Sequence, residues 1–222
     1  MRVDSRPAQG VLVVCTANRC RSVMAGALLS RRLGAAGVAG WVQSAGLLGE
    51  GQPAPPEAVS VMASYGLDVS RHRSHLMTAD ELGAASLVLA MAREHVRHAV
   101  VTEPAVWPRA FTLKEIVRRG QQAGPRASGE SLADWTARLH AGRERSALLG
   151  DSPDDDVPDP MGGPPQAYMM TVGLLDQLTG HLAELCWGSP GDGRPGWRPD
   201  RGLPRPRPAD RRPTQARHSR IQ

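Results

Sequence analysis

The sequence predicts an α/β protein built around a parallel β-sheet. Four short apolar segments, at 11–14, 41–44, 86–91 and 105–112, have the length and composition of buried strands. Segments with apolar residues at three-to-four spacing lie between and after them, a pattern typical of amphipathic helices. Strands that alternate with helices in this way form a parallel sheet whose connections are helical.

Local signals define the individual elements. The run VLVV at 11–14 is the first strand, and Pro108 is expected to place the fourth strand at an edge of the sheet, because proline cannot donate to a neighbouring strand. Gly34 and Gly66 are expected to end the first two helices. Helices are expected at six places: 23–33, 57–65, 93–101, 113–119, 132–149 and 166–187. Residues 151–165 (DSPDDDVPDPMGGPP) contain too many prolines and aspartates for regular structure and are expected to form a loop.

Composition divides the 222-residue chain into three parts. Residues 188–222 hold nine Arg, seven Pro, five Gly and three Asp with few apolar side chains, so this tail is expected to be disordered. Its charge is +6 and the whole chain carries +5, which leaves −1 for residues 1–187. We expect a flexible N-terminus at 1–9, one domain at 10–187 and the Pro/Arg-rich tail at 188–222. A nearly neutral domain argues against a specific nucleic-acid surface, although the tail could bind acidic surfaces weakly.

Three cysteines, Cys15, Cys20 and Cys186, do not make a disulfide framework. The chain shows no signal peptide and no twenty-residue apolar segment. The expectation is therefore a cytoplasmic protein with reduced thiols and no membrane span.

A polar cluster follows the first strand, in the stretch VLVVCTANRCRS. Cys15 ends the strand, Arg21 follows six positions later, Ser22 is next, and a helix begins behind them. In a parallel sheet, ligands bind beyond the carboxyl ends of the strands, where the next helix presents unpaired N–H groups. Residues 16–20 are expected to form a cradle of such donors, with Arg21 holding two oxygens of a phosphate-like dianion. This field favours the thiolate of Cys15 and makes it a nucleophile; the alternative is a cysteine that is merely buried at a strand end.

A phosphoryl-transfer site of this kind also needs a proton donor for the leaving oxygen. We choose Asp159, because Pro160 fixes the chain beside it and Gly162 and Gly163 permit close approach. The other candidates in the loop are Asp151, Asp154, Asp155 and Asp156. Asp154 to Asp156 are expected to be solvated loop charges.

Two histidine pairs have the spacing of metal ligands on one helical turn, namely His72 with His75 and His95 with His98. Neither pair has a cysteine or carboxylate at a convincing distance in the sequence, so we expect no metal and no other cofactor. His72 is expected to pack against or support the site.

The segment VCTANRCRS resembles the active-site signature of the low-molecular-weight protein tyrosine phosphatases. Further similarities follow in the same order over about residues 10–187: SAG at 44–46, GLDVSRHRSHLM at 66–77, LVLAMAREH at 87–95 and Asp159-Pro160. The resemblance implies a three-layer α/β fold, with a four-stranded parallel sheet, helices on both faces and a phosphate-binding loop between the first strand and the first helix. The chain resembles a bacterial branch of this family, and its composition is similar to that of actinobacterial proteins.

The resemblance also implies roles for residues. Cys15 would form a phosphocysteine, Arg21 would hold the phosphate oxygens, and Asp159 would act first as acid and then as base. Ser22 would donate to the thiolate, and Asn18 would hold the loop in a strained shape with a positive φ, although a simple turn asparagine is the alternative. The substrate would be a phosphorylated protein or a small aryl phosphate. The residues expected at the substrate are Thr16, Ala17, Asn18, Arg19, Cys20, Ser22, Leu47 and Met161.

The sequence departs from that family at several positions. Ala17 stands where the family usually has glycine, which costs little if its φ is negative. Met161 and the segment 47–52 lack the aromatic rings that sandwich a phosphotyrosine, so Leu47 and Met161 would offer an apolar slot instead. Arg19 at the rim should repel phosphoarginine and favour acidic substrates.

Two other functions remain open from the sequence. One is an arsenate reductase, since arsenate resembles phosphate. Cys186 is expected to be buried and so cannot pass a disulfide outwards, which leaves a reductase coupled to a low-molecular-weight thiol. The other is a non-enzymatic phosphate-binding module that uses the tail. Cys20, close to Cys15, is expected to protect the nucleophile through a reversible disulfide.

Overall fold

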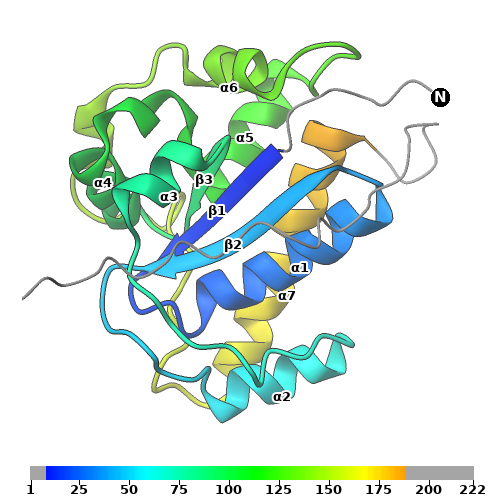
Figure 1. The fold of residues 1–222 in the computed structure, drawn as a ribbon, viewed down its shortest axis with the longest axis vertical. Coiled ribbons are helices and arrows are strands. Elements are labelled where there is room, and N and C mark those ends of the chain that lie inside the picture. The colour runs from blue at the N-terminus through cyan, green and yellow to red at the C-terminus, as the bar shows by residue number, and fades with distance from the viewer. Residues whose placement is uncertain (1–8, 189–222) are drawn as a thin grey trace, which may run out of the picture.

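A computed structural model describes residues 9–188, so the segments expected to be flexible, 1–9 and 188–222, lie almost wholly outside the described residues. Its centre is a sheet of four parallel strands, in the order β2-β1-β3-β4 (Figure 1). The strands are β1 (Gln9–Cys15), β2 (Gly40–Gly46), β3 (Leu87–Ala90) and β4 (Ala110–Thr112). The predicted four-stranded parallel sheet is confirmed, and the fourth strand lies at an edge as expected.

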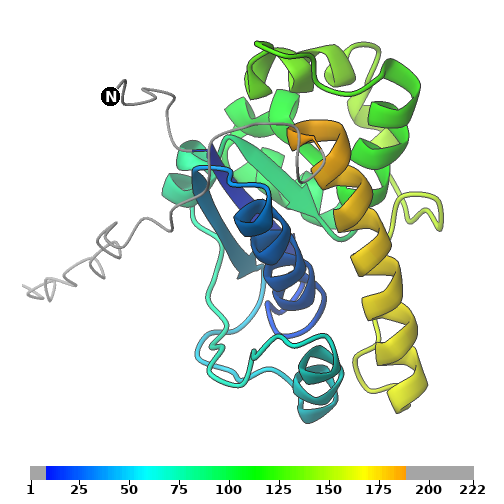
Figure 2. The same cartoon turned by 90° about the vertical axis from the view of Figure 1, so that its right-hand side faces the viewer.

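Helices cover both faces of this sheet, and each face has its own apolar core. The helices are α1 (Arg21–Ala35), α2 (Pro56–Ser64), α3 (Ala79–Ala84), α4 (Arg93–Thr102), α5 (Leu113–Ala123), α6 (Leu132–His140) and α7 (Pro165–Trp187), with short 3₁₀ helices η1 (Pro104–Arg109) and η2 (Arg145–Leu148). One core lies between the sheet and helices α1, α5 and α7, and α7 runs along α1 on this face (Figure 2). The other core lies between the sheet and helices α3 and α4.

The residues of β1 explain why this strand lies in the middle. Side chains alternate along a strand, so Val11 and Val13 join the core under α1, while Leu12 and Val14 join the core under α4. All four are at most 1% exposed, which is why the sequence reads as a continuous apolar run rather than an alternating one.

The register of the sheet decides which segments meet at its carboxyl edge. Cys15 pairs with Gly46 of β2, and Val14 pairs with Ala90 of β3. The arrowheads of β1 and β2 point to the same edge in Figure 1. The residues that follow β1, β2 and β3 in the chain are therefore brought together there.

Three sequence expectations about elements were wrong. Only Ala110–Thr112 of the expected fourth strand is extended, because Pro104 and Pro108 favour the 3₁₀ helix η1 in front of it. The expected helix at 132–149 is broken after His140, where Gly142 adopts a φ of 72°, and only the short helix η2 follows. Gly34 lies inside α1, which continues to Ala35, whereas Gly66 does follow α2 with a φ of 71°.

Helix α3 was missed, although its start carries a sequence signal. Thr78 and Glu81 form a reciprocal capping box, in which each side chain accepts a hydrogen bond from the backbone N–H of the other residue. Within residues 9–188, no helix is long and apolar enough to cross a membrane.

Candidate active site

Cys15 lies at the carboxyl end of β1 and is 3% exposed. Its Sγ atom is 3.0 Å from Oγ of Ser22, in the first turn of α1. The Ser22 oxygen also accepts a hydrogen bond of 3.0 Å from Nδ2 of Asn18. Because the Asn18 amide donates there, the hydroxyl hydrogen of Ser22 is left to be donated to the sulfur.

Asn18 holds the turn between Cys15 and α1. It has a φ of 49° and is the one non-glycine residue with positive φ in the described part of the chain, which confirms the predicted conformation. Its amide is fully buried: Nδ2 also donates to Oγ of Ser44 at 2.9 Å, and Oδ1 accepts from the N–H of His75 at 3.1 Å. A backbone N–H can only donate, so the contact with His75 fixes which end of the amide is oxygen.

The first turn of α1 is the candidate place for a bound anion. Helix α1 has no side-chain cap, so its first backbone N–H groups have no partner from a capping side chain. Ala17, in the turn before it, does not have a positive φ, and its Cβ therefore causes no backbone strain. These unpaired donors, at the positive end of the helix dipole, suit an anion.

Arg21 brings a positive charge to the same place and is 6% exposed. Its Nη2 atom donates to Oγ1 of Thr16 at 3.0 Å and to Oδ2 of Asp159 at 2.5 Å. Its Nη1 atom donates to the carbonyl oxygen of Val157 at 3.2 Å. The fold thus joins the arginine of the first loop to the aspartate chosen from the sequence, 138 positions later in the chain.

The Asp159 side chain is 42% exposed, unlike the arginine that it contacts. Its second oxygen, Oδ1, accepts a hydrogen bond of 3.1 Å from the N–H of Met161. This carboxylate therefore lies at the mouth of the site, open to solvent and to a bound substrate.

His95 lies behind Thr16 and was not predicted as part of the site. Its Nε2 atom is 3.0 Å from Oγ1 of Thr16, and the imidazole is fully buried. Burial, together with the nearby charge of Arg21, lowers the pKa of His95 to about 3, so the ring is neutral. From the sequence, His95 was a candidate only as a metal ligand. Its place in the motif LVLAMAREH was the signal that could have assigned it to the site.

Three predicted substrate residues have side chains that face the interior. Asn18, Cys20 and Ser22 are at most 2% exposed, so their side chains do not form the surface of the site. Burial, together with the charges of Asp159 and Cys15, raises the pKa of the Cys20 thiol to about 12. Cys20 is therefore a neutral thiol, and no disulfide joins it to Cys15.

The rim of the site is formed by the remaining predicted residues. Arg19 donates from Nε to the carbonyl oxygen of Pro53 at 2.9 Å, which places its guanidinium at the edge of the loop. The N–H of Leu47 donates to the carbonyl oxygen of Thr16 at 2.7 Å, and Leu47 packs against the core under α4. Met161 is 39% exposed. Leu47 thus lies in a segment that contacts the loop, and Met161 lies in a segment that contacts Asp159.

Gly46 and His72 support the loop from behind. A Cβ atom on Gly46 would lie 2.7 Å from the backbone nitrogen of Asn18, so only glycine fits at the end of β2. His72 contacts the carbonyl oxygen of Asn18 through Nε2 at 2.6 Å, in the supporting position expected for it. The motif SAG was the sequence signal for Gly46.

The acidic run before Asp159 is not solvated as expected. Asp155 is 7% exposed and pairs with Arg93 and Arg118 at 2.7 Å each. The Asp156 carboxylate accepts hydrogen bonds of 2.8 Å from the N–H groups of Arg93 and Ser152. Asp154 alone of the three is exposed, so the prediction was wrong for the other two. It ignored the cations that reach Asp155 from distant helices and the backbone N–H groups that reach Asp156.

A buried thiol beside a hydroxyl donor, an open helix start, a buried arginine and a carboxylate converge at one edge of the sheet. This combination offers a nucleophile, an anion cradle and an acid for one reaction, and it defines a cysteine-dependent phosphatase.

Comparison with known proteins supports this class. The sequence profile of the family described as "Low molecular weight phosphotyrosine protein phosphatase" matches residues 10–123. The "Probable low molecular weight protein-tyrosine-phosphatase EpsP" of Ralstonia solanacearum is 41% identical over 107 residues, which cover 48% of this chain and 71% of EpsP. The protein-arginine-phosphatase of Geobacillus stearothermophilus is 32% identical over 175 residues, covering 78% of this chain and 93% of that protein. A crystal structure of a low molecular weight protein tyrosine phosphatase from T. tengcongensis superposes with a TM-score of 0.61 and 34% identity, over 80% of this chain and 99% of the other.

This chain belongs to the low molecular weight phosphotyrosine protein phosphatase family. It is an enzyme of the phosphatase class, as the sequence predicted. The arsenate-reductase and non-enzymatic alternatives are not favoured by these relatives.

Proposed function

We propose that this chain hydrolyses phosphotyrosine in proteins, with Cys15 as nucleophile, Arg21 as phosphate clamp and Asp159 as general acid and base. The observation that carries the proposal is the contact of 3.0 Å between the Cys15 sulfur and the Ser22 hydroxyl, at the open start of α1. A thiolate held there faces the place where backbone N–H groups would hold a phosphate.

The first chemical step would transfer the phosphoryl group to sulfur. The Cys15 thiolate attacks phosphorus, the bond from phosphorus to the tyrosine oxygen breaks, and Asp159 gives its proton to that oxygen. The Arg21 contact with Asp159 must open for this, because the guanidinium then holds two phosphate oxygens instead.

The second step would release phosphate. Asp159 takes a proton from a water molecule, the water oxygen attacks phosphorus, and the bond from sulfur to phosphorus breaks. Ser22 stabilises the Cys15 thiolate that leaves, since its hydroxyl hydrogen is directed at the sulfur. The buried Thr16–His95 contact holds the Arg21 side chain from behind during both steps.

One feature of the site favours phosphoarginine as a second candidate substrate class. A cavity of about 460 Å³ adjoins Arg21 and Asp159, and the carboxylates of Glu94 and Asp151 line it, where a guanidinium could be accommodated. Arg19 opposes this substrate, since its guanidinium lies at the rim of the loop and repels another. We therefore expect phosphotyrosine to be preferred.

A substrate panel on the purified protein tests the proposal. We expect the highest kcat/KM for a phosphotyrosine peptide, a lower value for phosphoarginine and no thiol-dependent reduction of arsenate. Cys15→Ser is the control and should lower turnover at least about 10³-fold, with a phosphocysteine trapped in the unmodified enzyme by rapid quenching. Turnover by Cys15→Ser at the unmodified rate, or a faster rate on phosphoarginine, would contradict the proposal.

The remaining expectations on partners and tail stay proposals. Small aryl phosphates should be turned over as well, because the rim offers apolar surface at Leu47 and Met161 rather than a tight aromatic sandwich. Weak binding of the tail to acidic surfaces rests on the composition alone, and the domain limits 10–187 rest on the composition and on the extent of the resemblance.

A further inference from the structure

We propose that Asp155 is a positioning residue that sets the place of Asp159 during catalysis. The proposal rests on the proposed function, because it assumes that Asp159 is the general acid. It concerns a side chain that touches neither Cys15 nor Arg21 and that lies in a different cluster of charges.

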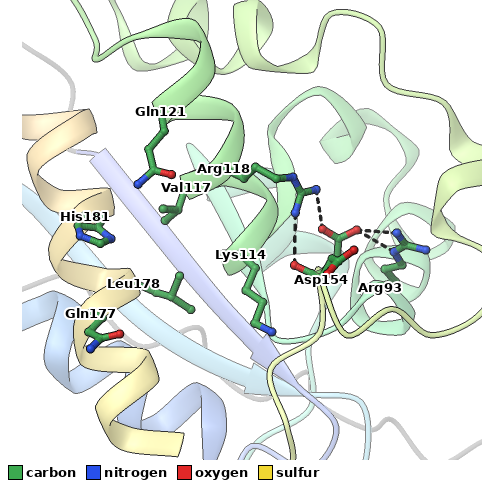
Figure 3. A pocket seen from close by; sticks show the side chains of 10 residues that line it. Arg93, Lys114, Val117, Arg118, Gln121, Asp154, Gln177, Leu178 and His181 are labelled. Atoms are coloured by element: carbon green, nitrogen blue, oxygen red, sulfur yellow. Dashed lines mark hydrogen bonds and ion pairs between the residues drawn. The ribbon is translucent and has the colours of Figure 1, made fainter.

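Two arginines from different helices hold the Asp155 carboxylate. Arg93, at the start of α4, donates to Oδ2 from Nε at 2.8 Å and contacts the same oxygen from Nη2 at 2.7 Å. Arg118 of α5 donates to Oδ1 from Nη2 at 2.7 Å and also contacts the carbonyl oxygen of Asp154. Figure 3 shows the two guanidinium groups reaching the acidic segment from opposite sides.

The charge state of Asp155 agrees with this role. Burial raises the pKa of its carboxyl, but the hydrogen bonds from Arg118 and Arg93 outweigh burial and hold the pKa below the ordinary value. The residue is therefore ionised at neutral pH and remains paired with both arginines.

Ion pairs and hydrogen bonds hold residues 153–156 of this loop. A cavity of about 560 Å³ lies beside the pairs, lined by Asp155 and both arginines together with Lys114 of α5 and Gln177 and His181 of α7 (Figure 3). Lys114 donates to the carbonyl oxygen of Pro153 at 2.7 Å, which adds a third cation to the same segment. Loss of the Asp155 charge would remove both ion pairs and leave the segment, beside this open space, with the hydrogen bonds of Asp156 and Lys114.

The chain between Asp155 and Asp159 is short and stiff. Val157 is 1% exposed and donates from its N–H to the carbonyl oxygen of Met91 at 2.8 Å. Prolines at 158 and 160 flank Asp159 and restrict the backbone on both sides of it. Asp155 and Val157 thus fix the chain that leads into Asp159, and a displacement of about 1 Å can cost a catalytic group about 10²-fold in rate.

The test compares Asp155→Asn with Asp154→Asn, which removes the same charge from the exposed neighbouring side chain. Phenyl phosphate needs a proton on its leaving oxygen, whereas 2,4-dinitrophenyl phosphate does not. We expect Asp155→Asn to lower kcat on phenyl phosphate about 10- to 100-fold and on the dinitrophenyl ester less than about threefold. Asp154→Asn should be near the unmodified enzyme on both substrates.

A double mutant separates positioning from general damage. If Asp155 acts through Asp159, then adding Asp155→Asn to Asp159→Asn should cause no further loss on phenyl phosphate. Equal losses on both substrates, no loss at all, or a full additional loss in the Asp159→Asn background would overturn the proposal.

A further variant keeps the test usable if Asp155→Asn folds poorly. Arg118→Gln removes one of the two pairs, at a side chain that is 44% exposed, and should give a smaller loss with the same dependence on the leaving group. Failure of the proposed function would be recognised separately, since Cys15→Ser would then keep its activity on both esters.

Discussion

Asn18 shows how much one residue contributes to the site. It supplies a backbone conformation that most residues avoid, and its buried amide joins the loop to β2 and to the segment before α3. Asparagine is one of the few side chains that both tolerates a positive φ and carries a donor and an acceptor. The sequence predicted the conformation, but the partners Ser44 and His75 came from the tertiary structure.

Replacing Asn18 tests the two contributions separately. Asn18→Gly keeps the conformation and loses the hydrogen bonds, whereas Asn18→Ala loses the bonds and also adds about 1–2 kcal/mol of backbone strain. We expect the alanine variant to have the lower free energy of unfolding, which is opposite to the usual order of alanine and glycine. Urea unfolding would show this, and an alanine variant more stable than the glycine variant would contradict it.

His95 gives a prediction about pH. Because burial lowers the pKa of His95 to about 3, its imidazole should stay neutral from pH 5 to pH 8. The NMR shifts of its ring should therefore be constant over this range, and any change in activity there must come from other groups. The urea-unfolded chain is the control, in which all histidines should titrate near pH 6.5. A His95 ring that titrates between pH 5 and 8 in the folded protein would contradict the prediction that the ring is buried and neutral.

At the scale of elements, the contact between the end of β2 and the loop after β1 decides the shape of the site. Cys15 and Gly46 are paired in the sheet, so the loop passes directly over Gly46. The first strand, the polar loop and α1 are close in sequence and could be predicted from it. The place of β2 beside them depends on the sheet order, which no local pattern specifies.

Gly46→Ala should disturb this contact. The new Cβ would lie under 3.0 Å from backbone atoms of Ala17 and Asn18, so the loop itself must move. We expect turnover to fall at least about tenfold, because the cradle of N–H groups loses its geometry. Gly83→Ala is the matched control, since its Cβ would meet no atom within 4 Å. Equal activity of the two variants would contradict the expectation.

The loop between η2 and α7 gives a second prediction at this scale, about stability. The folded-state pKa of Asp155 is lowered, so its contribution is fully present above about pH 4 and is lost as pH falls through the folded pKa. Asp155→Asn should lower the free energy of unfolding by about 1–3 kcal/mol at pH 7, and the difference should shrink below about pH 4. Urea unfolding at several pH values measures this, and a constant difference down to pH 3 would contradict it.

Errors in predicted elements also have physical reasons at this scale. The apolar residues of 105–112 fit a strand, but Val106 and Trp107 reach the core under α4 from a 3₁₀ helix instead. The spacing of apolar residues predicts which side chains are buried, but it does not predict whether the backbone that carries them is a strand or a 3₁₀ helix. The acidic run 154–156 was misjudged for a related reason, since Arg93 and Arg118 approach it only in the folded chain.

At the scale of the whole molecule, the basic charge belongs to the tail rather than to the domain. Removing residues 189–222 should therefore leave kcat/KM on a small aryl phosphate within about twofold of the full chain, because the proposed site lies within residues 15–161. Binding of the full chain to an acidic surface should weaken on truncation and at high salt. A large loss of turnover on the small substrate would show that the tail contributes to the site.

By itself, the sequence determined the alternation of strands and helices, the family and the local loop from Cys15 to Ser22, because these depend on neighbouring residues. The tertiary structure alone decided what lies opposite that loop: Asp159 against Arg21, Gly46 under Asn18, His95 behind Thr16, and Asp155 between two arginines. The reason is that these contacts join segments separated by 26 or more residues, and the packing of helices on a sheet sets their distances, which no spacing along the chain records.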